Sequence, residues 1–539
     1  MALATMKGWI ARCITDHCAP ESLCDSPRQP ELPTRVVNVG LHNGGVRIVE
    51  TKGARANYLC LSHCWGREQI VTTTKSSFEE RKAGIEWGEL SKTFQDAIAL
   101  TRSLGFEYIW IDSLCIIQDD AADWAFESAR MASVYSNGYL TIAATRSSSG
   151  SGGLYVHTPD VKVSGVLPNG EEYCLFFREK IDHHVDAGFE TGELTATETH
   201  YPLLSRAWVY QERMLSTRVI HFGKYEMFFE CKSSIDCECG SLGNHGTGSE
   251  TPAALIKLEL ADNLSNYGAT NNKRILESVR YQSARLWRTM VCCYTALSLT
   301  KSKDRLPAIG GLARQMHSRR GSKYLAGLWQ DSLQDDLLWE VYTVPRLKKP
   351  RPYPHNAPTW SWASVETFVG YSDVIVFTNV QESVAEEREP FEHFARTEAC
   401  TVEKSTVDEF GSIKHGSLTI TGLVVEATLE SEMKPDSEGA YLTYYASVSG
   451  GKLPIASDYL LDHAGPGQIL TGSPVCLLRM SLLQVGKKHR LFLLVLRRSL
   501  SIPGAFERIG TSTVTDDVGS VDSSGATYGF SRLHTVVIV

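Results

Sequence analysis

Phe106-Glu-Tyr-Ile-Trp-Ile-Asp112 is the stretch of this 539-residue chain from which the fold can be worked out. The run 107–111 is short and rich in aromatic and β-branched residues, which is typical of a buried strand, so Asp112 stands where that strand ends. From Asp119 the pattern becomes helical, because steps of four, three and four residues connect Trp124, Ser128, Met131 and Tyr135. A second apolar run, from Tyr139 to Ala144, predicts the next strand.

Glu127 projects on or beside the apolar face of this predicted helix. Burial of a carboxylate costs free energy and raises its pKa unless the group is paired or used in chemistry. One interpretation is a boundary glutamate that pairs with Arg130 or with another segment. The other is a catalytic carboxylate near the carboxyl ends of parallel strands, where open α/β sheets bind ligands.

The same alternation of strand and helix covers residues 58 to 144. The run 58–62 predicts a short buried strand, and a helix begins after Ser91 and ends at Gly105. This order of elements predicts a right-handed parallel α/β unit. Because parallel strands end at one edge of a sheet, four polar residues are expected there together: Ser62, His63, Asp112 and Ser113.

A helix predicted over 205–213 carries Arg206, Gln211 and Glu212. These side chains either form local ion pairs along the helix or build a polar wall that faces the Asp112 edge. The glycine-rich segment 146–154 matches neither the dinucleotide fingerprint nor the P-loop, and it predicts a flexible turn.

The composition excludes several classes of protein. Hydrophobic residues make up 42% of the chain and charged residues 22%, which is ordinary for a globular protein with a real core. A formal net charge of −8 argues against a nucleic-acid partner. Neither an apolar leader nor a run of about 18 apolar residues is present, so we expect no secretory signal and no membrane span. The 14 cysteines then indicate reduced thiols and a cytoplasmic protein.

Cysteines and a histidine gather near the N-terminus as Cys13, His17, Cys18 and Cys24. Their spacing is not that of a known zinc finger, so the default expectation is small buried thiols, with no metal and no cofactor assigned. A zinc site that later cysteines complete across the fold is the alternative. The candidates for completing it are Cys231, Cys237 and Cys239.

Several motifs, in this order, resemble the HET (heterokaryon-incompatibility) domain family of filamentous fungi. The resemblance covers residues 36–235 strongly and 280–370 more loosely. It is carried by Tyr58-Leu-Cys-Leu-Ser-His-Cys-Trp-Gly66, Tyr108-Ile-Trp-Ile-Asp-Ser-Leu-Cys-Ile-Ile-Gln118, Met131-Ala-Ser-Val-Tyr135, Gly153-Leu154, Arg206-Ala-Trp-Val-Tyr-Gln-Glu-Arg213, Asp304-Arg-Leu-Pro and Trp360-Ser-Trp-Ala.

The resemblance implies an α/β fold with a flavodoxin-like, Toll-receptor-like parallel sheet, followed by a helical segment and a β-rich C-terminal region. The expected segments are a Cys/His leader at 1–35, the HET domain at 36–240, a helical and aromatic-rich extension at 241–382, a charged linker at 383–410 and the β-rich region at 411–539.

The resemblance also implies cleavage of NAD, as substrate rather than cofactor, by a glutamate whose best match here is Glu127, with Asp112 as the second catalytic candidate. Loss of a cationic leaving group needs a carboxylate to stabilise an oxocarbenium-like centre. Asp112 or Ser113 would hold ribose hydroxyls and Arg206 the pyrophosphate. A ring would stack on Trp65 or Trp124, and the remaining substrate-binding candidates are Ser62, His63, Gln211 and Glu212.

Three functions stay open at this point. The first is an NAD-consuming effector of cell death in non-self recognition. The second is a non-enzymatic recognition module that assembles with an unknown incompatibility partner or with itself. The third is a HET core adapted to small-molecule metabolism, with a Cys–His–Asp set drawn from His63, Cys64, Asp112 and Cys115. Both cysteines stand in apolar surroundings, which favours inert buried thiols.

Overall fold

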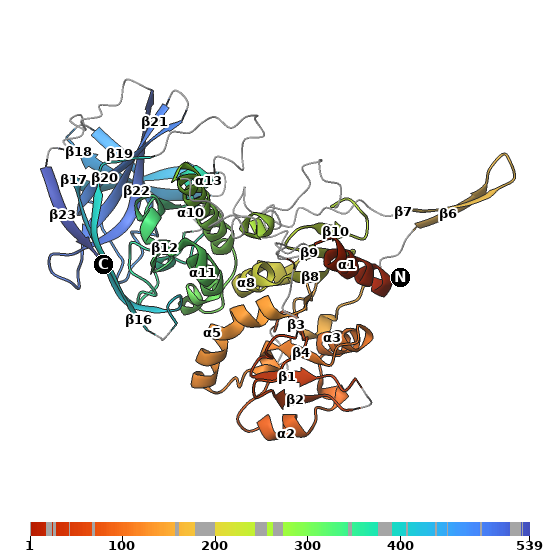
Figure 1. Ribbon diagram of the computed structural model, residues 1–539. Coiled ribbons are helices and arrows are strands. Elements are labelled where there is room, and N and C mark those ends of the chain that lie inside the picture. The colour runs from red at the N-terminus through yellow and green to blue at the C-terminus, as the bar shows by residue number, and fades with distance from the viewer. Residues whose placement is uncertain are drawn as a thin grey trace. The chain divides into compact units, whose positions relative to one another are not determined.

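The computed structural model of the chain forms two compact units, Met1–Ser265 and Asn266–Val539 (Figure 1). The predicted division into five segments stays a prediction. The structure describes residues 2–17, 24, 29–41, 44–66, 71–156, 161–177, 200–242, 256–261, 273–342, 348–375, 391–405, 408–436, 439–449, 451–485, 488–517, 530 and 532–539.

An eight-stranded mixed sheet forms the centre of the first unit, in the order β10-β9-β8-β5-β3-β4-β1-β2. Its four middle strands, β8, β5, β3 and β4, are parallel, and the flanking strands pair antiparallel. The strands are β1 (Arg35–Asn38), β2 (Arg47–Glu50), β3 (Leu59–Ser62), β4 (Tyr108–Ile111), β5 (Leu140–Ala143), β8 (Arg218–Phe222), β9 (Met227–Cys231) and β10 (Ile235–Cys237).

The parallel strands have the flavodoxin-like order, in which the first strand along the chain, β3, lies between the second, β4, and the third, β5. This confirms the predicted α/β class. The chain leaves β3 in one direction through α3 (Lys92–Ser103) and returns over it through α5 (Ala121–Asn137). Right-handed crossovers in opposite directions place these helices on opposite faces of the sheet, and Figure 1 shows them on either side of β3 and β4.

Short apolar runs explain why these segments become central strands. Every residue of β3 and β5 is buried, as expected of parallel strands covered on both faces. Ser91 caps α3 by accepting the amide of Phe94, and Asp120 caps α5 by accepting two amides. Further helices of this unit include α1 (Ala2–Asp16), α2 (Phe78–Ala83), α4 (Asp112–Cys115) and α8 (Ala207–Leu215), and a separate hairpin joins β6 (Val161–Val166) to β7 (Glu172–Phe177).

The glycine-rich segment after β5 is held in place rather than flexible. The amide of Gly153 donates to Thr93 Oγ1 at 3.2 Å, and the amide of Leu154 donates to Asp96 Oδ2 at 3.0 Å. Ser147 Oγ donates to the carbonyl of Gly153 at 2.5 Å. These bonds tie the turn to the first turns of α3.

The second unit combines a helical, tryptophan-rich part with a β-rich part, as predicted. Five tryptophans of the helical part are fully buried: Trp287, Trp329, Trp339, Trp360 and Trp362. Its elements are α10 (Lys273–Thr295), α11 (Pro307–Arg320), β11 (Tyr324–Leu325), β12 (Leu328–Trp329), α12 (Leu333–Asp336), β13 (Trp339–Val341), β14 (Val369–Tyr371) and α13 (Ser372–Ile375).

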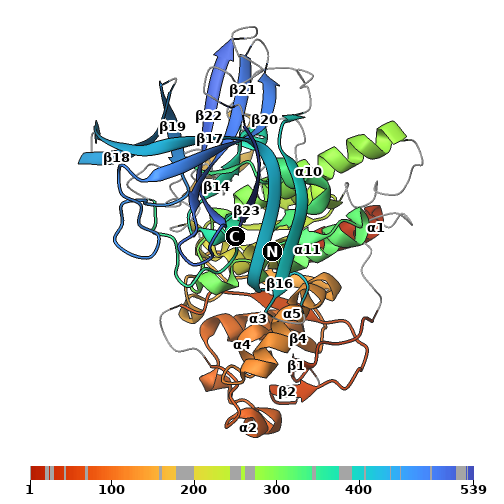
Figure 2. The same ribbon diagram turned by 90° about the vertical axis from the view of Figure 1, so that its left-hand side faces the viewer.

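In the β-rich part, six long strands close a sheet on itself, because β17 pairs with both β18 and β20 (Figure 2). Leucines of β20 and β21 face an enclosed apolar core. The strands are β15 (Glu392–His393), β16 (Arg396–Lys404), β17 (Ile413–Asp436), β18 (Gly439–Val448), β19 (Gly451–Ser457), β20 (Pro474–Val485), β21 (Lys488–Arg498), β22 (Phe506–Asp517) and β23 (Arg532–Ile538). Within the described ranges, every helix is too short or too polar to cross a membrane.

Candidate functional site

The carboxyl edge of the parallel strands gathers most of the predicted site residues of the first unit. β3 ends at Ser62 and is followed by His63, and β4 ends immediately before Asp112. β3 and β5 are the pair at which the strand order reverses, which is where doubly wound sheets bind ligands. We call the polar side chains at this place the switch-point cluster: Ser62, His63, Trp65, Asp112, Arg206 and Glu212.

Glu212 is the most deeply buried acid of the switch-point cluster. It lies on α8, and Ser62 Oγ donates to its Oε2 at 2.5 Å. The hydroxyl of Tyr135, on α5, donates to the carbonyl of Leu61 at 3.3 Å, and Tyr135 opposes the rise in the pKa of Glu212. Burial raises the pKa of Glu212 to about 7, and the charge of Asp112 acts in the same direction, whereas the bond from Ser62 opposes the shift. This carboxyl group therefore changes charge near neutral pH.

His63 and Asp112 form the next part of the cluster. His63 Nδ1 lies 3.7 Å from Asp112 Oδ1, and the indole nitrogen of Trp65 donates to Asp112 Oδ2 at 3.0 Å. Burial lowers the pKa of His63, so the imidazole is neutral at pH 7. Its Nε2 is buried and has no hydrogen-bond partner among the described residues. A neutral, unpartnered imidazole nitrogen can accept a proton.

Arg206 supplies the positive charge of the cluster. It precedes α8, and its NH1 donates to the carbonyl of His63 at 3.0 Å. Trp65, Asp112 and Arg206 are each partly exposed, whereas Ser62, His63 and Glu212 are buried. The cluster thus has an accessible outer part and a desolvated inner part.

Three further residues were predicted to bind the substrate. The amide of Ser113 donates to Asp112 Oδ1 at 2.6 Å, and its buried hydroxyl has no partner among the described residues. Gln211 is buried on α8. Trp124 is half-buried in the first turn of α5.

Glu127 has a different environment from Glu212. It is 2% exposed, and the guanidinium of Arg35, the first residue of β1, donates to it at 3.3 Å. The same guanidinium donates to Asp123 at 2.6 Å and, through Nε, to the carbonyl of Cys115 at 2.6 Å. Burial raises the pKa of Glu127, while Thr34 and Arg35 oppose that shift. The catalytic role of Glu127 stays a prediction, and these contacts support pairing to another segment instead.

The predicted Cys–His–Asp set lacks a reactive thiol. Cys64 and Cys115 are buried, and burial raises the pKa of both thiols, that of Cys115 to about 12. Because the thiolate is the nucleophile, thiols of this kind are inert at neutral pH. The geometry therefore favours carboxylate chemistry at this edge.

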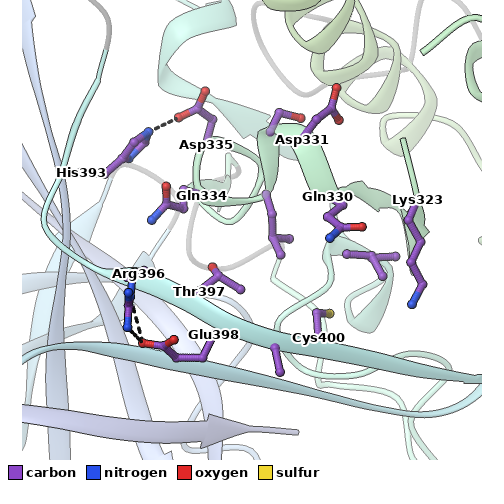
Figure 3. A pocket seen from close by; sticks show the side chains of 14 residues that line it. Lys323, Gln330, Asp331, Gln334, Asp335, His393, Arg396, Thr397, Glu398 and Cys400 are labelled. Atoms are coloured by element: carbon purple, nitrogen blue, oxygen red, sulfur yellow. Dashed lines mark hydrogen bonds and ion pairs between the residues drawn. The ribbon is translucent and has the colours of Figure 1, made fainter. Parts of the chain in front are cut away.

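Two features were not predicted from the sequence. Tyr135 fits the apolar stripe of α5, and only the fold brings it close enough to Glu212 to affect the pKa of that carboxyl group. The second unit contains a polar cavity of about 350 Å³, whose wall carries paired charges (Figure 3). His393 Nε2 lies 3.3 Å from Asp335, and Arg396 lies 2.7 Å from Glu398. Burial lowers the pKa of His393, so its imidazole is neutral at pH 7, and Arg396 neutralises Glu398. The cavity is therefore a weaker candidate for catalysis than the switch-point cluster.

Two groups of side chains in the first unit have the composition of metal ligands. One consists of Cys13, His17, Cys24 and Cys231, and the other of Glu226, Cys237 and Cys239. The fold thus brings Cys231 to the N-terminal residues and holds Cys237 and Cys239 in a separate group. Cys18 lies outside the described residues.

Residues 58–212 match the family model described as heterokaryon incompatibility protein (HET). The match begins just before β3 and ends at Glu212 itself, so it contains the whole switch-point cluster. No curated protein and no solved structure matches the chain significantly.

Proposed function

Because residues 58–212 of this chain constitute a HET domain, we propose that the chain acts in heterokaryon incompatibility. Its role there is that of an effector of cell death on meeting a non-self partner. We further propose that its switch-point cluster hydrolyses the nicotinamide–ribose bond of NAD. The observation that carries the proposal is the buried carboxyl group of Glu212, which accepts a hydrogen bond from Ser62 at the point where the strand order reverses.

The chemistry follows from the charge of the leaving group. Nicotinamide is cationic while it is bonded to the ribose and leaves as a neutral ring, so the positive charge passes to the ribose as the C–N bond breaks. An ionised Glu212 stabilises that developing oxocarbenium centre. Approach of the cationic ring also favours the ionised form of the carboxyl group.

Water completes the hydrolysis. Its oxygen bonds to the ribose carbon, and it gives up a proton, which the free Nε2 of neutral His63 accepts. Asp112 accepts hydrogen bonds from ribose hydroxyls, Arg206 binds the pyrophosphate, and Trp65 contacts a ring. The products are nicotinamide, ADP-ribose and a proton.

Purified full-length protein incubated with NAD tests this proposal directly. We expect nicotinamide release by the wild type and a loss of about 100-fold or more in Glu212→Gln, because a preorganised charge at the reacting centre commonly contributes that much. Glu127→Gln is the matched control, since it removes a buried carboxylate from the same domain, and it should retain turnover.

Other outcomes separate the alternatives. Loss of turnover in a folded Glu127→Gln variant, with normal turnover in Glu212→Gln, would transfer the catalytic role to Glu127. Wild-type protein that leaves NAD intact, both as a monomer and after assembly, would remove the enzymatic proposal in favour of a recognition module. Expression of the wild type and of Glu212→Gln in a filamentous fungus, with viability counted, tests the cell-death role.

A further inference from the structure

Four potential ligand atoms meet in a second part of the first unit, none of them from a residue of the switch-point cluster. The thiols of Cys13, Cys24 and Cys231 and a ring nitrogen of His17 all lie within 4.8 Å of one another. Cys13 is on the last turn of α1, and His17 follows directly after the helix ends. Cys231 is the last residue of β9. Segments more than 200 residues apart thus contribute to one group.

The distances and burial of this group fit a tetrahedral ion. Bonds of about 2.3 Å to sulfur and 2.0–2.1 Å to nitrogen at tetrahedral angles place the two ligand atoms about 3.6 Å apart. Cys231 Sγ lies 3.6 Å from His17 Nδ1. The three cysteines are at most 2% exposed, and no disulfide joins any of the described cysteines.

The surroundings stabilise negative charge on the sulfurs. The amides of Ser233 and Ser234 point at Cys231 Sγ, at 3.4 and 3.2 Å. Arg218 Nε donates to Cys13 Sγ at 3.2 Å, and its NH2 donates to the carbonyl of Cys24 at 2.7 Å. Donors aimed at ligand sulfurs are typical of the outer shell of metal sites. A cation bound by three thiolates would carry a net charge of about −1, which Arg218 balances.

We propose that Cys13, His17, Cys24 and Cys231 bind one structural zinc ion. Three thiolates and one imidazole select a soft-to-borderline cation of tetrahedral preference, and four protein ligands leave no open position for catalysis. The ion ties α1 to β9, where Trp9 already stacks on Phe229 with ring centroids 6.2 Å apart. All four ligands and Arg218 lie outside residues 58–212, so the site lies outside the HET match and is independent of NAD cleavage.

Metal analysis of the full-length protein tests this proposal. Protein made in zinc-supplemented medium and purified without chelator should contain one zinc per chain, and X-ray absorption should show three sulfurs and one nitrogen around it. Cobalt substitution should give the intense visible bands of a tetrahedral thiolate site. Cys231→Ser should lower the zinc content at least 10-fold, whereas Cys239→Ser, in the neighbouring group, should leave it unchanged.

A variant that fails to fold does not remove the test. The wild type alone, stripped by a strong chelator, should lose several degrees of melting temperature and regain them with added zinc but not with magnesium. Wild-type protein without zinc, a coordination shell poor in sulfur, iron in place of zinc, or an unchanged zinc content in folded Cys231→Ser would each overturn the proposal.

Discussion

At the scale of single residues, the burial of Glu212 makes the stability of the first unit depend on pH. The folded-state pKa of Glu212 is raised to about 7 from 4.5, chiefly by burial. Between these values the folded state keeps a proton that the unfolded state has lost, so the free energy of unfolding falls as pH rises through this window. The fall is complete above about pH 7 and corresponds to roughly 3 kcal/mol.

Glu212→Gln should abolish this fall in the free energy of unfolding, because the amide group still accepts the hydrogen bond from Ser62 but cannot ionise. Chemical denaturation of both proteins at pH 5 and at pH 8 measures it. We expect the wild type to lose about 2–3 kcal/mol more than the variant between these pH values. Equal losses in the two proteins would mean that Glu212 titrates at its ordinary pKa.

Nicotinamide release by the wild type should rise over the same window, since only the ionised carboxylate stabilises the ribose cation.

The residue scale also shows where prediction from sequence stops. Glu127 was singled out because periodicity places it beside an apolar stripe, and its burial follows from that. Its partner, Arg35, is 92 residues away, and no local pattern indicates such a pair. Ser62 and Glu212, which are 150 residues apart, were both named as binding residues, but their direct bond depends on the packing of α8 against α5.

At the scale of elements, the contact between α3 and the turn after β5 fixes the edge of the switch-point region. Gly153 has φ +66 and ψ −175, a backbone conformation that only glycine adopts without strain. A Cβ there would also lie 2.7 Å from Asp96 Oδ2, the atom that accepts the amide of Leu154.

Gly153→Ala should therefore lower the free energy of unfolding by about 1–3 kcal/mol through strain alone, and further through the clash with Asp96. Gly53→Ala is the matched control, because Gly53 also has a positive φ but open space around its Cβ position. Chemical denaturation of both variants separates the cost of backbone strain from the cost of the clash with Asp96. A Gly153→Ala variant no less stable than Gly53→Ala would show that the turn is not held against α3.

Elements were the scale at which the sequence was most informative. Short apolar strands and helix caps can be identified from the local sequence. The order of elements between β3 and β5 was therefore predictable. The glycine-rich turn was predicted to be flexible because its partners, Thr93 and Asp96, are about 60 residues away. Cys231 was one of three cysteines proposed to complete the N-terminal group, and only the fold separates it from Cys237 and Cys239.

At the scale of the whole molecule, two compact units each carry their own buried charges. In the second unit, Arg288 is fully buried on α10 and donates to Asp336 at 3.0 Å and to Asp373 at 2.7 Å. Its guanidinium thereby joins the long helix to α12 and α13. Removal of one partner from a buried ion pair leaves uncompensated charge and commonly costs about 3–5 kcal/mol.

Arg288→Met should consequently destabilise the second unit by about that amount, because two carboxylates lose their counter-ion while the methionine fills much of the volume. Hydrogen exchange measured by mass spectrometry resolves where the effect falls. Peptides from α10 and β14 should exchange at least 10-fold faster, whereas peptides from β3 and β4, whose bonds lie within the first unit, should keep their wild-type rates.

Chelation of the proposed zinc should give the opposite pattern, with α1 and β9 exchanging faster and α10 unchanged. Uniformly faster hydrogen exchange along the chain in either experiment would show that the two units unfold together.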